Sequence, residues 1–85
     1  MSSIVVITGA GAGVGRATAM EFARNGHDVA LLSRDPARLE SAAAEARKFG
    51  VRALAIPTDV ADAAAVESAA DKVETELGPI DVWVN

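Results

Sequence analysis

Apolar runs of strand length alternate along the chain with stretches in which apolar residues recur at helical spacing. The apolar runs are rich in Val, Ile and Leu, as in strands of a parallel sheet that is covered on both faces. They predict strands over residues 3–8, 28–33, 51–56 and 80–84. The stretches between them predict helices over residues 14–24, 36–49 and 63–77.

The predicted helices are bounded by residues with clear positional preferences. Asp35 and Asp62 stand where N-cap side chains accept hydrogen bonds from the first turn, and Pro36 suits the first helical position. Gly26, Gly50 and the Gly78-Pro79 pair mark the helix ends. The chain therefore reads β-α-β-α-β-α-β with short connections.

This alternation is typical of a parallel sheet with helical crossovers. Right-handed crossovers and a glycine loop after the first strand predict a doubly wound, Rossmann-type α/β sheet, with its strands in the order 3-2-1-4. Residues 1–85 are expected to form one unit. We expect this unit to be the incomplete N-terminal part of a larger domain, truncated after its fourth strand.

Composition narrows the possible partners and the compartment. The net charge is −4 and no basic cluster occurs, so nucleic acid is not an expected partner. The chain contains no cysteine, which excludes disulfides, thiolate catalysis and cysteine metal sites and fits a reducing cytoplasm. No basic leader and no apolar run of about 20 residues is present, so no membrane partner is expected.

A glycine-rich loop between the first strand and the first helix is the strongest candidate for chemistry. Glycines let the backbone approach a ligand closely, and the helix N-terminus offers unpaired N–H groups to an anion. We expect this loop to bind the pyrophosphate of a dinucleotide. Its expected contact residues are Gly9, Gly11, Ala12, Gly13, Val14 and Gly15.

The glycine spacing excludes several common loops. A Gly-x-Gly-x-x-Gly motif would need its third glycine at Val14 or at Arg16. A Walker A loop would need a lysine directly after a glycine, and none follows one here. Methyltransferase loops usually follow an acidic residue, whereas this strand ends in Thr8.

The pattern that fits is Thr-Gly-x-x-x-Gly-x-Gly, formed by Thr8, Gly9, Gly13 and Gly15. On this motif the chain resembles the N-terminal portion of the short-chain dehydrogenases/reductases. The resemblance implies an oxidoreductase that transfers a hydride between a nicotinamide cofactor and a small carbonyl or alcohol substrate. It also implies that the full-length form is a homo-oligomer.

The catalytic residues of the family fall outside this sequence. In the family, a tyrosine, a lysine four residues later, a serine and an asparagine carry out proton transfer. This chain contains no tyrosine. We therefore assign no catalytic residue to it and expect the 85-residue chain alone to be inactive.

The residues after the second strand favour one cofactor. An acidic residue there commonly accepts hydrogen bonds from the adenosine ribose and selects NAD. This chain has Ser33, and Arg34 can form charge-assisted hydrogen bonds with a 2′-phosphate. NADP(H) is therefore favoured over NAD(H). Asp35 could instead be the ribose acid, although it suits a helix N-cap better, and Arg16 is a second candidate phosphate contact.

Three more contacts rest on the resemblance. Asp59 is expected to meet the adenine amino group, with backbone contacts from Val60; otherwise Asp59 only tightens the loop before Asp62. Residues 78–85 resemble the family's fourth strand, and Asn85 would be the first Asn of its Asn-Asn-Ala-Gly motif. Asn85 would then help to position the cofactor.

Two other side chains are interpreted without a role in chemistry. Trp83 is expected to pack under a helix, and His27 is expected to lie on the surface.

Two other hypotheses remain open at this stage. The chain could be a stand-alone, non-catalytic dinucleotide-binding module, or a flavin or S-adenosylmethionine protein of related fold. A last strand without a further neighbour would be an apolar edge. The isolated chain is thus expected to be poorly stable and to associate, and a monodisperse monomer with a cooperative melt would contradict this.

Overall fold

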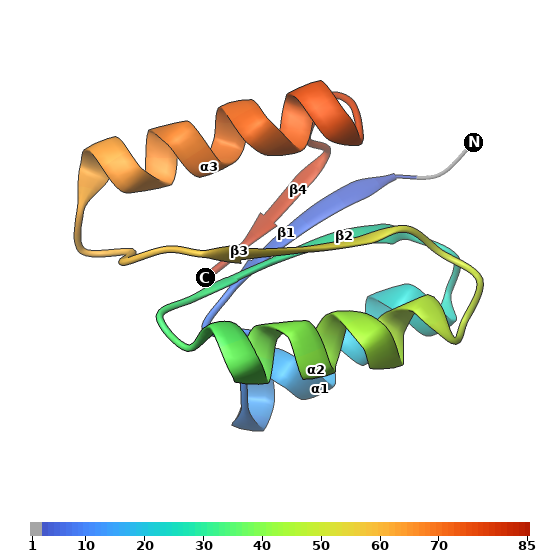
Figure 1. Ribbon diagram of the computed structural model, residues 1–85. Helices are drawn as coiled ribbons and strands as arrows, with labels where there is room; N and C mark the ends of the chain where they lie inside the picture. Colours follow the sequence, from blue (N-terminus) through green and yellow to red (C-terminus); the bar gives the residue numbers. More distant parts are fainter. Residues whose placement is uncertain (1–2) are drawn as a thin grey trace.

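The computed structural model describes residues 3–85, and in it a four-stranded parallel sheet is covered by helices on both faces (Figure 1). In this sheet the third strand of the chain lies beside the second, the second beside the first and the first beside the fourth, which confirms the predicted Rossmann-type α/β fold. The elements are β1 (Ile4–Thr8), α1 (Gly13–Arg24), β2 (Asp28–Ser33), α2 (Pro36–Arg47), β3 (Ala53–Pro57), α3 (Ala63–Glu76) and β4 (Val82–Val84).

The core is split into two layers by the sheet. Helices α1 and α2 cover one face, and α3 covers the other (Figure 1). Successive strand side chains point to opposite faces, so Val5 and Ile7 pack toward α1 and α2, whereas Val6 packs toward α3. All three side chains are fully buried, as expected for a parallel strand with both faces covered.

The amino-terminal edge of the sheet is held by a buried carboxylate. Asp28 at the start of β2 is only 4% exposed. It accepts hydrogen bonds from the backbone N–H of Arg52 and from Arg52 Nε, both at 2.9 Å. Arg52 also donates to the carbonyl of Leu77, at the end of α3. One ion pair thus links β2, the entry to β3 and the end of α3.

Because of this network, the third strand begins later than predicted. The prediction that the third strand begins at residue 51 is wrong by two residues, because the Arg52 amide bonds the Asp28 side chain. The second helix ends at Arg47 instead of residue 49, since Lys48, Phe49 and Gly50 each donate to a carbonyl three residues earlier.

The last strand is also shorter than predicted. The Ile4 amide donates to the Asp81 side chain at 2.8 Å instead of to a backbone carbonyl, whereas the Asp81 amide donates to the Ile4 carbonyl at 2.9 Å. The strand therefore begins at Val82. Within residues 3–85, β4 pairs only with β1, and Val82 is 40% exposed. Association through this edge stays a prediction.

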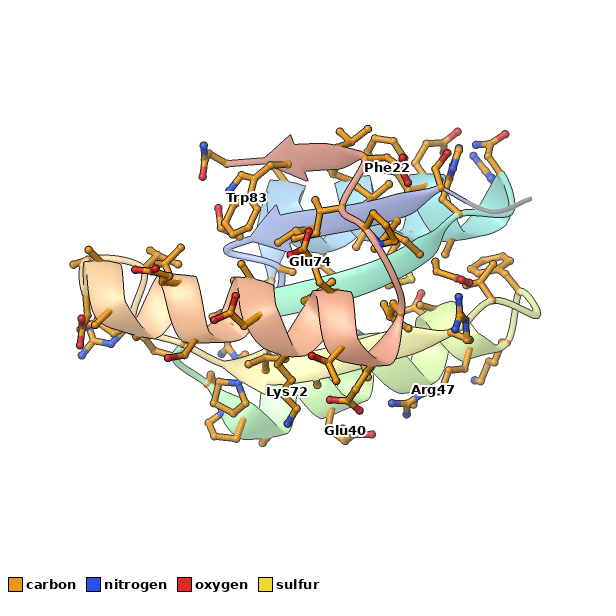
Figure 2. All side chains as sticks on the ribbon, turned by 90° about the horizontal axis from the view of Figure 1, so that it is seen from above. Phe22, Glu40, Arg47, Lys72, Glu74 and Trp83 are labelled. Atoms are coloured by element: carbon orange, nitrogen blue, oxygen red, sulfur yellow. The ribbon has the colours of Figure 1, made fainter. Side chains whose placement is uncertain are left out.

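The indole of Trp83 lies on the same face of the sheet as α3 (Figure 2). It packs, half-buried, against the apolar cluster beneath that helix, which confirms the expected packing role. In the described part of the chain, no helix is long and apolar enough to cross a membrane.

Replacing Arg52 tests the importance of the buried ion pair. Arg52→Ala leaves Asp28 with one backbone donor inside the protein, and we expect the free energy of unfolding to fall by about 1–2 kcal/mol, since half of the arginine is solvated. Urea denaturation measures this. As a control, Glu40→Gln breaks the exposed pair with Arg47, labelled in Figure 2, and should change stability by less than about 0.5 kcal/mol. Equal losses of stability in the two variants would contradict the stabilising role assigned to the ion pair between Asp28 and Arg52.

Candidate nucleotide-binding site

The connections that follow β1, β2 and β3 lie at one edge of the sheet, because the strands are parallel (Figure 1). This carboxyl edge is where open α/β sheets bind ligands. The glycine loop leaves β1 there, next to the residues that follow β2. The topology thus brings together segments that the sequence separates.

Backbone conformation explains two glycines of the loop. Gly9 has φ +64° and Gly13 has φ +61°, both in the left-handed region that residues with a side chain rarely adopt. Gly9 turns the chain out of β1, and Gly13 turns it into α1. Their spacing in the sequence motif therefore reflects the two bends of the loop.

Close contact explains the third glycine. A Cβ at Gly15 would lie 2.1 Å from the carbonyl oxygen of Gly9, a backbone atom that cannot move aside as a side chain would. The first turn of α1 therefore rests directly on the exit of β1. Any side chain at this position would push the helix away from the sheet.

The N-terminus of α1 is left open. Its N-cap is Ala12, which offers no side-chain acceptor, and the first turn has no acidic residue. By contrast, α2 and α3 are capped by Asp35 and Asp62, as predicted: Asp35 accepts from the Arg38 amide, and Asp62 from the amide of Ala64. Among helices in residues 3–85, α1 alone presents its first N–H groups without a side-chain acceptor. Such a terminus favours an anion.

A cavity of about 260 Å³ lies between this loop and the start of α2. It joins three loop residues to the predicted selectivity residues Ser33 and Arg34. The glycine loop can lie this close to Ser33 because residue 11 is a glycine. A Cβ at this position would lie only 3.2 Å from Ser33 Oγ. The lining residues are Gly9, Gly11, Ala12, Ser33, Arg34, Asp35 and Arg38.

Arg38 was not among the sequence candidates for this site. It lies in the first turn of α2, three residues after the N-cap Asp35. A basic residue at this place, just behind Ser33 and Arg34, is the signal that could have identified it.

The other predicted contacts lie outside that cavity. Val14 is 84% exposed beside the open helix end, and Val60 is 50% exposed. Asp59 accepts a hydrogen bond from the Ala61 amide at 3.0 Å, so it does tighten the loop before α3. Its contact with adenine stays a prediction. Asn85 is exposed and accepts a hydrogen bond from the Trp83 indole at 3.0 Å.

Two side chains make contacts that the sequence did not indicate, and one of them, His27, corrects an expectation. Arg16 is engaged elsewhere: it donates to Glu45 at 2.8 Å and to Ser41, and so joins α1 to α2. His27 is not a free surface residue, because its ring packs edge-on against Phe22 and its Nδ1 is shielded from solvent without a hydrogen-bond partner. Both contacts depend on residues that the local pattern does not connect.

The sheet order and the open, glycine-lined helix terminus define a Rossmann-type nucleotide-binding unit. A family model for short chain dehydrogenases matches residues 3–85. The chain belongs to this family, which confirms the resemblance and disfavours the flavin and S-adenosylmethionine alternatives.

Individual relatives agree with this assignment. A 2,3-dihydro-2,3-dihydroxybenzoate dehydrogenase of Bacillus subtilis is 39% identical over 82 residues, covering 96% of this chain and 31% of the relative. The structure is similar to L-sorbose reductase from Gluconobacter frateurii complexed with NADPH and L-sorbose, with a TM-score of 0.94 and 38% identity. The match covers 99% of this chain and 32% of the reductase. It is also similar to NAD⁺-bound xylitol dehydrogenase, with a TM-score of 0.92 and 37% identity. This match covers 95% of this chain and 31% of the dehydrogenase. This chain spans about a third of their lengths.

Two glycine substitutions distinguish conformational strain from a backbone clash. Gly13→Ala meets open space but requires a positive φ, and should lower the free energy of unfolding by about 1–2 kcal/mol. Gly15→Ala gains helix propensity but collides with Gly9, and should lower it by about 3 kcal/mol. Urea denaturation of both variants shows which substitution lowers the free energy of unfolding more. A Gly15→Ala variant as stable as the parent would show that α1 does not rest on β1 in this way.

Proposed function

We propose that this chain is the cofactor-binding, N-terminal portion of an NADP(H)-dependent short-chain oxidoreductase. The whole enzyme would transfer a hydride between nicotinamide and the carbonyl or alcohol carbon of a small substrate. The observation that carries the proposal is the open N-terminus of α1, seated on β1 by the Gly9–Gly15 contact and facing the edge where ligands bind.

The pyrophosphate would occupy the glycine loop. Gly13, Val14 and Gly15 begin α1, so their N–H groups belong to the unpaired first turn. Gly9, Gly11 and Ala12 complete the loop with backbone that has no bulky side chain. An anion here gains both hydrogen bonds and the favourable end of the helix dipole. This part of the site serves NAD(H) and NADP(H) equally.

Preference for NADP(H) rests on Ser33 and Arg34. A carboxylate at the end of β2 would repel a 2′-phosphate, whereas Ser33 Oγ is neutral and already within reach of the loop. Arg34 is exposed at the same cavity and supplies a cation. Solved relatives carry either cofactor, NADPH in L-sorbose reductase and NAD⁺ in xylitol dehydrogenase. The preference is therefore argued from this chain's own residues.

The remaining contacts extend the same cofactor along the sheet edge. Asp59 and Val60 follow β3 and would meet adenine. Asn85 follows β4 and would lie toward the nicotinamide ribose. Thr8 fastens this end of the sheet, since its hydroxyl donates to the Val84 carbonyl at 3.4 Å.

Catalysis itself would come from the part of the enzyme beyond this segment. The chain contains no tyrosine, so it cannot supply the family's acid–base residue. Alone it would bind the cofactor without turnover. A small carbonyl or alcohol as substrate, a homo-oligomeric full-length form and a cytoplasmic location are parts of the same proposal. The rival proposal, a stand-alone binding module, requires a partner that covers the β4 edge.

Substitution of Arg34 tests the cofactor preference. Arg34→Ala should weaken NADPH binding by about tenfold to a hundredfold, the loss of one charge-assisted contact, and should leave NADH binding nearly unchanged. Calorimetric titration of the full-length protein with each cofactor gives both values. Arg24→Ala is a matched control, because Arg24 is exposed at the far end of α1 and pairs with Glu21. Equal loss for both cofactors would refute the role of Arg34.

A further inference from the structure

A second arginine lines the cavity that contains Arg34. Arg38 lies in the first turn of α2, and its Cβ is 3.3 Å from the place where a Cβ at Gly11 would stand. The absence of a side chain at Gly11 thus lets the base of Arg38 approach the glycine loop closely. Its side chain is 66% exposed, which leaves its guanidinium room to turn toward a ligand in the cavity.

Arg38 already has an anionic partner. Asp35 Oδ1 accepts a hydrogen bond from the Arg38 amide at 3.1 Å, and Asp35 Oδ2 lies 3.5 Å from Arg38 Nε. Asp35 therefore caps α2 and holds the Arg38 side chain with the same carboxylate. Its side chain is 51% exposed, and a solvated pair of this kind contributes little stability. A stronger anion could displace the carboxylate from Arg38 at small cost.

The charge at the cavity explains why a second cation is needed. A phosphate monoester carries a charge of about −1.5 to −2 at neutral pH. Arg34 alone supplies one positive charge, and Asp35 on the same cavity opposes it. With Arg38 turned to the ligand, two guanidinium groups compensate both the phosphate and the carboxylate more fully.

We propose that Arg38 is the second cation of the 2′-phosphate site, and that Asp35 is its exchangeable counter-ion. This inference rests on the proposed NADP(H) function. It makes Asp35 a residue that weakens NADP(H) binding, since its negative charge competes with the phosphate for Arg38. It also contradicts the reading of Asp35 as a ribose acid, which would strengthen NAD(H) binding.

The test is calorimetric titration of the full-length protein with NADPH, NADH, 2′,5′-ADP and 5′-AMP. Arg38→Ala should weaken NADPH and 2′,5′-ADP about tenfold, and NADH and 5′-AMP less than about twofold, because only the first two carry the 2′-phosphate. Arg38→Lys retains the charge and should keep most of the affinity. Arg24→Ala again serves as the control, with no selective loss.

Asp35→Asn gives the sharpest result. Asparagine caps helices as well as aspartate, so α2 should be preserved, and the melting temperature checks this. Loss of the competing charge should strengthen 2′,5′-ADP binding by about threefold at low salt, with a smaller gain at high salt. Binding of 5′-AMP should not change.

Several outcomes would overturn the inference, and they separate it from the proposed function. Weaker NADH binding by Asp35→Asn would identify Asp35 as the ribose acid. Equal loss of NADPH and NADH by Arg38→Ala would identify Arg38 as structural. If Arg34→Ala is selective and Arg38→Ala is not, this inference fails and the proposed function stands. If the parent protein binds neither cofactor, both fail.

Discussion

The contact between the Gly9 carbonyl and Gly15 is the constraint on which the site depends. A parallel sheet requires a helix after β1, but it does not require that helix to touch the end of the strand. Here the missing side chain at residue 15 lets α1 do so. The helix N-terminus is then held at the carboxyl edge of the sheet, with Gly9 and Gly13 making the two bends that lead to it. The same three glycines therefore determine both the geometry of the loop and the position of α1.

Helix capping determines which terminus is available to a ligand. Asp35 and Asp62 close α2 and α3 with their own carboxylates, whereas Ala12 leaves α1 open. At the opposite edge of the sheet, Asp28 and Asp81 are committed to the backbone and to Arg52. Acidic side chains thus stabilise the scaffold, and within residues 3–85 none caps the open end of α1, although Asp35 lines the neighbouring cavity. An anionic cofactor fits this distribution of charge.

The order of elements and the glycine loop could be predicted from the sequence because both depend on local patterns. Apolar runs, Asp35 as a cap and the spacing of Gly9, Gly13 and Gly15 all act over a few residues. That Ser33 lies near the glycine loop could also be predicted, because parallel strands bring their carboxyl ends to the same edge of the sheet.

Contacts between distant side chains could not be predicted in this way. Asp28 bonds Arg52, 24 residues away, and this shortens β3. Arg16 bonds Glu45, 29 residues away, so its guanidinium is held against α2, and its contact with a phosphate stays a prediction. Arg38 follows Ser33 and Arg34 closely in the sequence, but a basic residue in the first turn of a helix is commonly just solvent-exposed. The packing of α2 beside the loop is what places it at the cavity.

The central claim is that the open N-terminus of α1 holds the pyrophosphate of NADP(H). Backbone amide chemical shifts, followed by ¹H–¹⁵N NMR during titration with NADPH, test it most directly. The account predicts that the largest shifts occur in residues 11–16, with a second group at Ser33 and Arg34. Shifts confined to the groove between α1 and α2, which is lined by Ser41 and Phe49, would contradict it.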